Sequence, residues 1–446
     1  MHQTELASQV IFGWDPFWVS TVLFIGTYLV VISEKVNRAI IALLGASLMI
    51  MLGVLTQEAA VNGVDFNTIG LLTGMMVIVA ITQRSGIFQY IAIWSAKKVK
   101  ASPWGIMLML SVVTAIFSAL LDNVTTVLLI APITLLITQE LQIPPFPFLF
   151  SEIFASNIGG ASTLIGDPPN IMIGSAVGLG FNDFVYNLAP ITIFIMLINL
   201  GMIYLIWGRK LTASDDKRQH VMSFDERKAL QDIPLLKRSL FVLFLVLVLF
   251  MNAHSLNLEP ATIAMGGAAL LMLLDNIGRT SEEQTINVDK CFKEAEWITI
   301  FFFVGLFIIV AGVEHSGVLS LLAEKMLHLT EGDFNTTTLA ILWMSAIISA
   351  LVDNIPFVAT MIPMIKSMAP AFGGTEALMP LWWSLALGAC LGGNGSLIGA
   401  SANLIVAGYA ERAGFPIAFL KFMAYAFPLM LVSIAISHVY ITWRFL

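Results

Sequence analysis

Apolar stretches long enough to cross a lipid bilayer dominate this sequence, and they constrain its fold more than any motif does. A helix needs about 20 apolar residues to cross roughly 30 Å of hydrocarbon. The clear candidate spans are Phe17–Ser33, Ala39–Thr56, Phe66–Thr82, Leu188–Trp207, Ser239–His254, Pro260–Leu274, Trp297–Val313 and Phe422–Thr442. Only 11% of the residues are charged, against about 25% in soluble domains. A water-soluble fold is therefore excluded.

Four further apolar stretches are interrupted by polar residues. Pro103–Thr138 contains the run DNVTT and Thr338–Ala369 contains DNIP, while Phe146–Gly180 and Leu381–Gly408 are broken by Gly, Ser, Asn and Pro. We interpret the first two as re-entrant hairpins and the other two as spans that unwind inside the membrane. Non-helical backbone at that depth is tolerated only where it lines a cavity or is buried in protein. The prediction is an all-α polytopic membrane protein with ten crossings and two hairpins.

The distribution of basic residues tests this topology. If the N-terminus lies outside, the basic residues collect in segments that face the cytoplasm, and of the 22 only Lys325, Lys366 and Arg444 fall outside. Cytoplasmic segments carry an excess of Lys and Arg, so the partition supports a multi-pass protein of the cell (inner) membrane in this orientation. The amphipathic stretch Ile87–Lys100 is predicted to lie at the interface, with its lysines towards the lipid headgroups.

The chain is predicted to have two halves. Residues 1–208 form the first half and residues 239–446 the second, and the polar segment 209–238 is interpreted as a cytoplasmic linker rather than a regulatory or docking element. The N-terminus has no basic region and is expected to be an uncleaved lead into the first span. The sequence contains no basic patch that would predict nucleic-acid binding.

The two halves repeat each other. Three pairs of segments match in order: Thr68–Gly86 with Thr299–Gly317, Ser118–Pro132 with Ser349–Pro363, and Gly159–Asn170 with Gly392–Asn403. The first two pairs share an offset of 231 and the third is two residues out of register. Each half has five crossings, an odd number, so the copies must be inverted. Discontinuous segments at matching places in inverted halves indicate a transport site near the midplane.

Three acidic residues are candidates for proton or ion coupling. Asp122 and Asp353 lie at the predicted hairpin tips, each followed by Asn. An acid inside a membrane is a functional candidate, although each could instead cap the helix that follows it. Asp167 lies in the first break, where the second has Ala400. This asymmetry makes Asp167 the better candidate for coupling.

Hydroxyls and amides around the breaks and tips are the candidate substrate ligands. They are Asn123, Thr125, Thr126, Asn157, Ser162, Thr163, Asn170, Asn354, Asn394, Ser396, Ser401 and Asn403. The glycines expected to permit tight backbone turns are Gly159, Gly160, Gly166, Gly392, Gly393, Gly395 and Gly399. Glu152, before the first break, is either a further site residue or water-facing. Cys390 is interpreted as a packing residue rather than a ligand of a thiophilic solute.

No Arg or Lys is predicted at the midplane, so a multiply charged anion would have only helix dipoles, amides or co-bound cations to hold it. A neutral hydroxylated solute, or a small cation exchanged for protons, fits this set of residues at lower electrostatic cost. The two cysteines, Cys291 and Cys390, are too few and too far apart for a disulfide framework or a thiolate metal site. No cofactor or catalytic residue is predicted. The signatures of an intramembrane aspartyl protease and of a Walker A ATPase are absent from the sequence.

The motifs resemble a known family. LDNVTTVLLIAPIT, EIFASNIGGASTLIGDPPN and CLGGNGSLIGASANLIVAGYAERAG are similar to the ArsB/NhaD branch of the ion transporter superfamily, which includes arsenite permeases, sodium/proton antiporters and the melanosomal P protein. The last two motifs are especially close to the P-protein type. The resemblance covers most of the chain from about Phe66. It implies a scaffold part, a moving part with the hairpins and broken helices, and coupling to H⁺ or Na⁺. It also allows a homodimer and a separate cytoplasmic ATPase subunit.

Three functions follow in order of preference. The first is proton-coupled efflux of arsenite or antimonite as the neutral trihydroxide, with amides and hydroxyls binding the solute. The second is sodium/proton antiport, with the carboxylates binding the cation. The third is transport of a carboxylate or other anion. The second hairpin departs from the first, because Thr125-Thr126 is replaced by Pro356-Phe357, so the two tips need not bind the same species.

Overall fold

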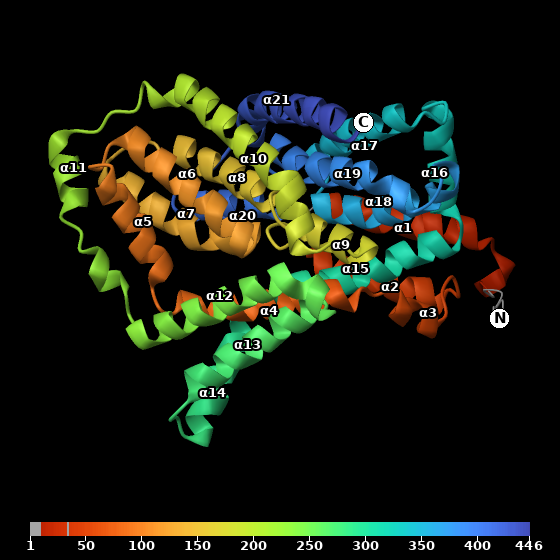
Figure 1. Cartoon of the computed structure of the whole chain (residues 1–446), viewed down its shortest axis with the longest axis horizontal. Helices are drawn as coiled ribbons and strands as arrows, with labels where there is room; N and C mark the ends of the chain where they lie inside the picture. The colour runs from red at the N-terminus through yellow and green to blue at the C-terminus, as the bar shows by residue number, and fades with distance from the viewer. Residues whose placement is uncertain (1–9, 34) are drawn as a thin grey trace.

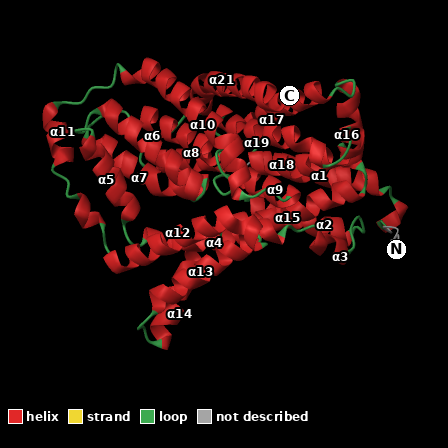
Figure 2. Ribbon diagram, viewed as in Figure 1, coloured by secondary structure: helices red, strands yellow, loops and turns green. Residues whose placement is uncertain are grey.

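The computed structural model describes residues 10–33 and 35–446, and every regular element in that part is helical (Figures 1 and 2). The first half contains η1 (Ile11–Gly13), α1 (Pro16–Ser33), α2 (Arg38–Met51), α3 (Gln57–Asn62), α4 (Phe66–Gln83), α5 (Ile87–Lys98), α6 (Pro103–Leu120), α7 (Asn123–Glu140), α8 (Phe146–Gly160), α9 (Pro168–Val177), α10 (Phe181–Ile203) and η2 (Tyr204–Gly208). The linker contains α11 (Asp215–Met222) and η3 (Glu226–Ala229). The second half contains α12 (Ile233–Leu256), α13 (Pro260–Asn276), α14 (Ser281–Glu294), α15 (Trp297–His315), α16 (Val318–Leu329), α17 (Phe334–Leu351), α18 (Asn354–Ser367), η4 (Ala369–Ala371), η5 (Glu376–Leu378), α19 (Met379–Gly392), η6 (Gly393–Gly395), α20 (Ser401–Arg412) and α21 (Phe419–Phe445).

The expected all-α polytopic membrane fold is confirmed. In the described residues, nine helices are long and apolar enough to span a membrane, and α2 and α13 are shorter apolar helices. The predicted span to Thr56 was too long, because α2 ends at Met51. Gly53 has a φ of +79°, and the N–H groups of Gly53 and Val54 return to the carbonyls of Ile50 and Met49. This is a Schellman cap, which terminates a helix even where apolar residues continue.

The order of elements repeats between the halves, from α4–α10 to α15–α21. Figure 1 shows α2, α4, α12, α13 and α15 on one side of the molecule and the hairpins and broken helices on the other. Helix α4 packs on α13 of the other half, and α15 packs on α2.

Two matched glycines set these crossings. A Cβ on Gly74 would lie 2.5 Å from the backbone of Ala264, and one on Gly305 would lie 2.5 Å from the backbone of Ala42. Small residues at such positions let helix backbones approach closely in membranes. The recurrence of Gly74 at Gly305 therefore reflects the same interhelical contact made twice.

The linker packs against the rest of the protein. Lys97 donates to Glu226 (2.5 Å) and to the carbonyl of Phe224 (2.9 Å), which places the Lys97 ammonium on the linker rather than towards headgroups as expected. This hydrogen bond lowers the pKa of Glu226 below its usual value. The N–H of Gln231 donates to the carbonyl of Ser85. The linker is thus held at both ends of α5.

Gly86 offers a direct test of this contact. Its φ is +81°, and a Cβ there would meet the carbonyl oxygen of Ala229 in the linker at 1.8 Å. Gly317, its counterpart in the repeat, has the same φ but open space around it. We expect Gly317→Ala to cost only the left-handed strain, about 1 kcal/mol. Gly86→Ala should also displace the linker and raise its cleavage by trypsin several-fold in limited proteolysis. Equal cleavage in the two variants would contradict this docking.

Candidate functional site

Each hairpin tip meets the break of the broken helix in its own half. The N–H of Asn123, after the turn between α6 and α7, donates to the carbonyl of Gly166 at 3.0 Å, and the N–H of Asn354 donates to Gly399 at 3.3 Å. Both arms of the first hairpin have 18 residues, as many as the shorter spans, so this contact supports the hairpin interpretation better than length does. The two contacts are equivalent in the repeat.

Asp122 and Asp353 both cap the helix that follows them. The Asp122 carboxylate accepts from the N–H (2.7 Å) and hydroxyl (2.5 Å) of Thr125, and Asp353 accepts from the N–H of Ile355 at 3.0 Å. The capping role that the sequence left open is therefore present at both tips. Asp353 has a further partner across the break, because its other oxygen accepts from Ser401 at 2.7 Å.

A cluster of asparagines joins the two halves. The side-chain amide of Asn157 in α8 donates to Asn394 at 3.0 Å and to Asn403 at 2.9 Å, both in the second half. The Asn123 amide donates to Asn157 at 3.4 Å. All four side chains are buried, and two of their polar atoms, Asn123 Oδ1 and Asn394 Nδ2, have no protein partner. These are the candidate ligands that the fold brings together across the repeat.

Other candidate ligands instead hold the broken backbone. Asn170 donates to the carbonyls of Thr163 (2.9 Å) and Ala161 (3.2 Å), and Asn403 donates to those of Gly393 and Ser396 at 2.8 Å each. The hydroxyls of Ser162 and Thr163 donate to backbone carbonyls, and Ser396 accepts from a backbone N–H. Thr126 Oγ1 is buried without a partner. The bonds made by Asn170, Asn403, Ser162, Thr163 and Ser396 satisfy backbone polar groups that unwinding exposes.

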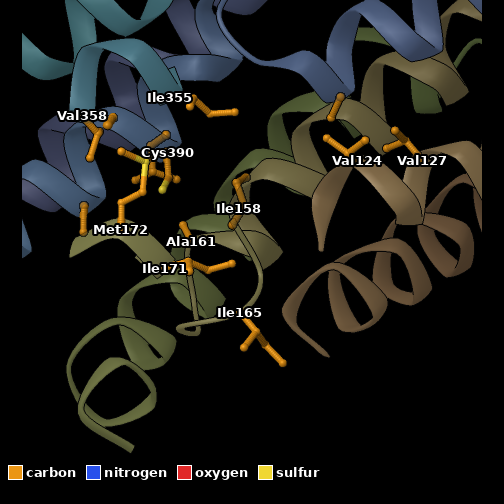
Figure 3. Packing of buried hydrophobic residues seen from close by; sticks show 14 of the residues in the cluster. Val124, Val127, Ile158, Ala161, Ile165, Ile171, Met172, Ile355, Val358 and Cys390 are labelled. Carbon is orange, nitrogen blue, oxygen red and sulfur yellow. The ribbon is translucent and has the colours of Figure 1, made fainter. Parts of the chain in front are cut away.

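The glycines of the breaks allow two backbone segments to approach each other closely. None of Gly159, Gly160, Gly166, Gly392, Gly393, Gly395 and Gly399 has a positive φ. A Cβ on Gly160 would meet the carbonyl of Gly166 at 2.6 Å, and one on Gly393 would meet that of Gly399 at 3.0 Å. The expected need for glycine stands, but its reason is the closeness of two backbones rather than an unusual turn. Figure 3 shows Ile158, Ala161 and Ile171 around the first break, with Cys390 beside Met172.

Asp167 faces the second half. Its side chain is fully buried, makes no capping bond to α9, and lies 3.4 and 3.5 Å from the amide nitrogen of Asn354 at the other hairpin tip. Cys390 is buried and hydrogen-bonds to Asn170, so it packs within the site without exposure. Asp167 thus links the first break to the second tip.

Arg38 is a site residue that the sequence did not reveal. Its guanidinium lies 3.3 Å from the Asp353 carboxylate and hydrogen-bonds to Ser401 and to Thr299. It also lies over the ring of Phe302. The sequence analysis placed no Arg or Lys at the midplane and did not count Arg38 among the site residues. The structure brings Arg38 to the second tip because α2 begins at Arg38 and that helix end lies beside Asp353. A short apolar helix with Arg at its first position was the only signal.

Two cavities flank α15 at opposite ends. One of about 430 Å³ is lined by Arg38, Asp353, Ser401, Thr299 and Glu296 among others. The second, of about 320 Å³, lies between the far end of α15, the start of α4, α9 and α18. Eight residues of α15, about 12 Å of helix, separate Thr299 in the first from Phe307 in the second. In the orientation that the sequence predicts, the first would open towards the cytoplasm and the second outwards.

Paired hairpins and broken helices with a cavity at each end define a membrane transporter. The chain belongs to the CitMHS family, described as citrate transporter, whose family model matches residues 28–388. Several of its relatives are named transporters.

The relatives agree with this placement. An uncharacterised transporter of Mycobacterium tuberculosis is 41% identical over 431 residues, covering 96% of this chain and 98% of that protein. The P protein of Homo sapiens is 30% identical over 516 residues, covering 96% of this chain and 60% of the P protein. The expected likeness to the P protein is confirmed, while the narrower ArsB/NhaD assignment stays a prediction.

A solved structure shares the fold. The YdaH transporter of Alcanivorax borkumensis superposes with a TM-score of 0.58 at 15% identity, covering 95% of this chain and 98% of that one. At this identity the likeness concerns the fold alone. It agrees with the helical architecture described above.

Proposed function

We propose that this protein is a secondary transporter that moves a carboxylate-bearing anion together with protons or other cations. The observation that carries the proposal is the guanidinium of Arg38, which lines the 430 Å³ cavity at the second hairpin tip. Arginine presents a planar fork of donors that matches a carboxylate. The family description as citrate transporter supports the same substrate class.

The charges of the cavity favour an anion that arrives with a cation. Arg38 is the one basic residue in the described lining, and Asp353 and Glu296 are its two acids, so the ionised lining sums to one negative charge. A free multiply charged anion would be repelled by that balance. A proton or cation bound with the anion would offset it, which is the electrostatic basis of the proposed coupling.

Arsenite or antimonite efflux is the second candidate. The neutral cluster of Asn157, Asn394 and Asn403, with the unpartnered amide of Asn394, suits a hydroxylated solute. This cluster is buried away from the described cavities, so the solute would have to enter in another conformation. Sodium/proton antiport is the third, and it would use Asp122, Asp167 and Asp353 as cation ligands.

One set of vesicles separates these candidates. The purified chain is reconstituted into proteoliposomes, and labelled citrate, labelled arsenite and ²²Na⁺ are each supplied with and without a pH gradient. We expect citrate uptake that a proton or cation gradient drives above equilibrium, with no added ATPase subunit. Movement of arsenite or Na⁺ alone, with citrate unmoved, would contradict the proposal. Cross-linking of the same sample tests the expected homodimer.

A further inference from the structure

Glu152 is a buried acid with no role in the site described above. It lies in α8 with 1% of its surface exposed. One carboxyl oxygen is hydrogen-bonded to the hydroxyl of Thr134 in α7, and the other, Oε2, has no protein partner. In the repeat its place is taken by Leu385. The side chain is therefore no part of the repeated architecture, and it is not water-facing, the alternative that the sequence left open.

No basic group compensates Glu152 in the described part of the chain. The helices α6 and α19 and the turn η6 have no Asp, Glu, Lys or Arg within their bounds. The charged groups on the other elements against α8 are engaged or lie at helix ends. They are Glu140 of α7 with His220, Asp183 at the start of α10, Glu411 and Arg412 at the end of α20, Lys421 of α21 over Phe146, and Arg444 at the end of α21 over Tyr440. An ionised carboxylate without a basic partner costs several kcal/mol in such a place. Glu152 is accordingly a neutral carboxylic acid in this conformation.

A cavity reaches close to this acid. Thr138 lies one helical turn beyond Thr134, about 6 Å along α7, and lines a cavity of about 710 Å³ together with Gln139 and Lys421. By the charge partition this cavity opens at the cytoplasmic end. Two threonines therefore separate Glu152 from space that water can fill.

On the other side of Glu152, polar groups continue along α8 to the asparagine cluster. Ser156 lies one turn further along α8, and its hydroxyl donates to the carbonyl of Asn123 at 3.1 Å. The next residue, Asn157, is the centre of that cluster. Polar groups thus continue along α7 and α8 from the 710 Å³ cavity, through Glu152, to the meeting point of the halves.

We propose that Glu152 is a proton-carrying site of this transporter, loaded and emptied through the cavity next to Thr138. The carboxylic O–H bond breaks when the contact of α7 with α8 loosens, and the proton passes to water in the cavity; reprotonation of the carboxylate restores the packed state. This rests on the proposed cation-coupled transport and names the proton as a coupled ion.

Two measurements test it on the reconstituted full-length protein. In proteoliposomes, Glu152→Gln should keep citrate counterflow within about two-fold of wild type but lower pH-gradient-driven accumulation at least ten-fold. Ser384→Ala, which removes a buried hydroxyl from the corresponding helix α19, is the matched control and should leave both unchanged. Accumulation that persists in Glu152→Gln would overturn the proposal.

The second measurement needs no substrate. Infrared difference spectra of wild type between acid and alkaline buffer should contain a protonated-carboxyl band that is absent in Glu152→Gln and shifted in Thr134→Val. A wild-type spectrum without that titrating band would overturn the proton site even if citrate transport is found. If citrate is not transported, the infrared band still tests whether Glu152 is a proton site. A titrating band together with absent citrate transport would contradict the proposed substrate and not the proton site.

Discussion

Arg38→Ala should lower kcat/KM for citrate uptake by about 30-fold or more. The substitution removes the guanidinium that contacts Asp353, Ser401 and Thr299. Hydrogen bonds to a charged group contribute about 2 kcal/mol, which corresponds to roughly 30-fold in an equilibrium constant. The measurement is initial uptake in proteoliposomes at matched protein content.

Arg38→Lys distinguishes geometry from charge. A lysine ammonium is a point charge without the planar fork, so we expect this variant to recover only part of the activity. Lys35→Ala, three residues away on exposed chain, is the control and should transport as wild type does. Wild-type kinetics in Arg38→Ala would remove Arg38 from the site and with it the main support for an anionic substrate.

Asp167→Asn should abolish gradient-driven transport, with a loss of about 100-fold, while the protein still folds. The carboxyl makes no capping bond to α9, and Ala400 occupies the same place in the repeat, so the helix start does not require an acid. The Asn side chain cannot take up or release a proton. It is nearly isosteric with Asp, so the contact with Asn354 should be retained. Thermal unfolding should change little.

The control for Asp167→Asn is Glu324→Gln, an exposed acid on α16. Gradient-driven uptake is compared with counterflow in the same vesicles, because counterflow needs no net movement of the coupled ion. If accumulation in Asp167→Asn equals that of Glu324→Gln, Asp167 has no coupling role.

The sequence was enough to predict the helical class, the repeat, the hairpins and the breaks. These features depend on local hydropathy and on residues that are identical in the two halves, such as Gly74 and Gly305. Both can be recognised from the sequence alone. The end of α2 was missed because Leu52, Val54 and Leu55 continue the apolar run past Gly53, and hydropathy does not register a glycine cap.

The composition of the site was harder to predict. Arg38 is 315 residues from Asp353 and 363 from Ser401, and it lies outside the matched segments, so only tertiary structure brings it to the tip. The roles of the amides were equally hidden. Asn157 and Asn170 look alike in sequence, yet one amide crosses between halves and the other satisfies the carbonyls of its own break.

The crossing of Gly74 on Ala264 has a consequence for biosynthesis. The partner of α4 is encoded 190 residues later, the difference between 264 and 74. At about 5–20 residues per second of translation, α4 waits roughly 10–40 s in the membrane before α13 emerges. During that interval its glycine face lies against lipid or the insertion machinery. Because α2 waits in the same way for α15, the first half cannot complete its own packing, and assembly of the transporter is delayed until the second half has been made.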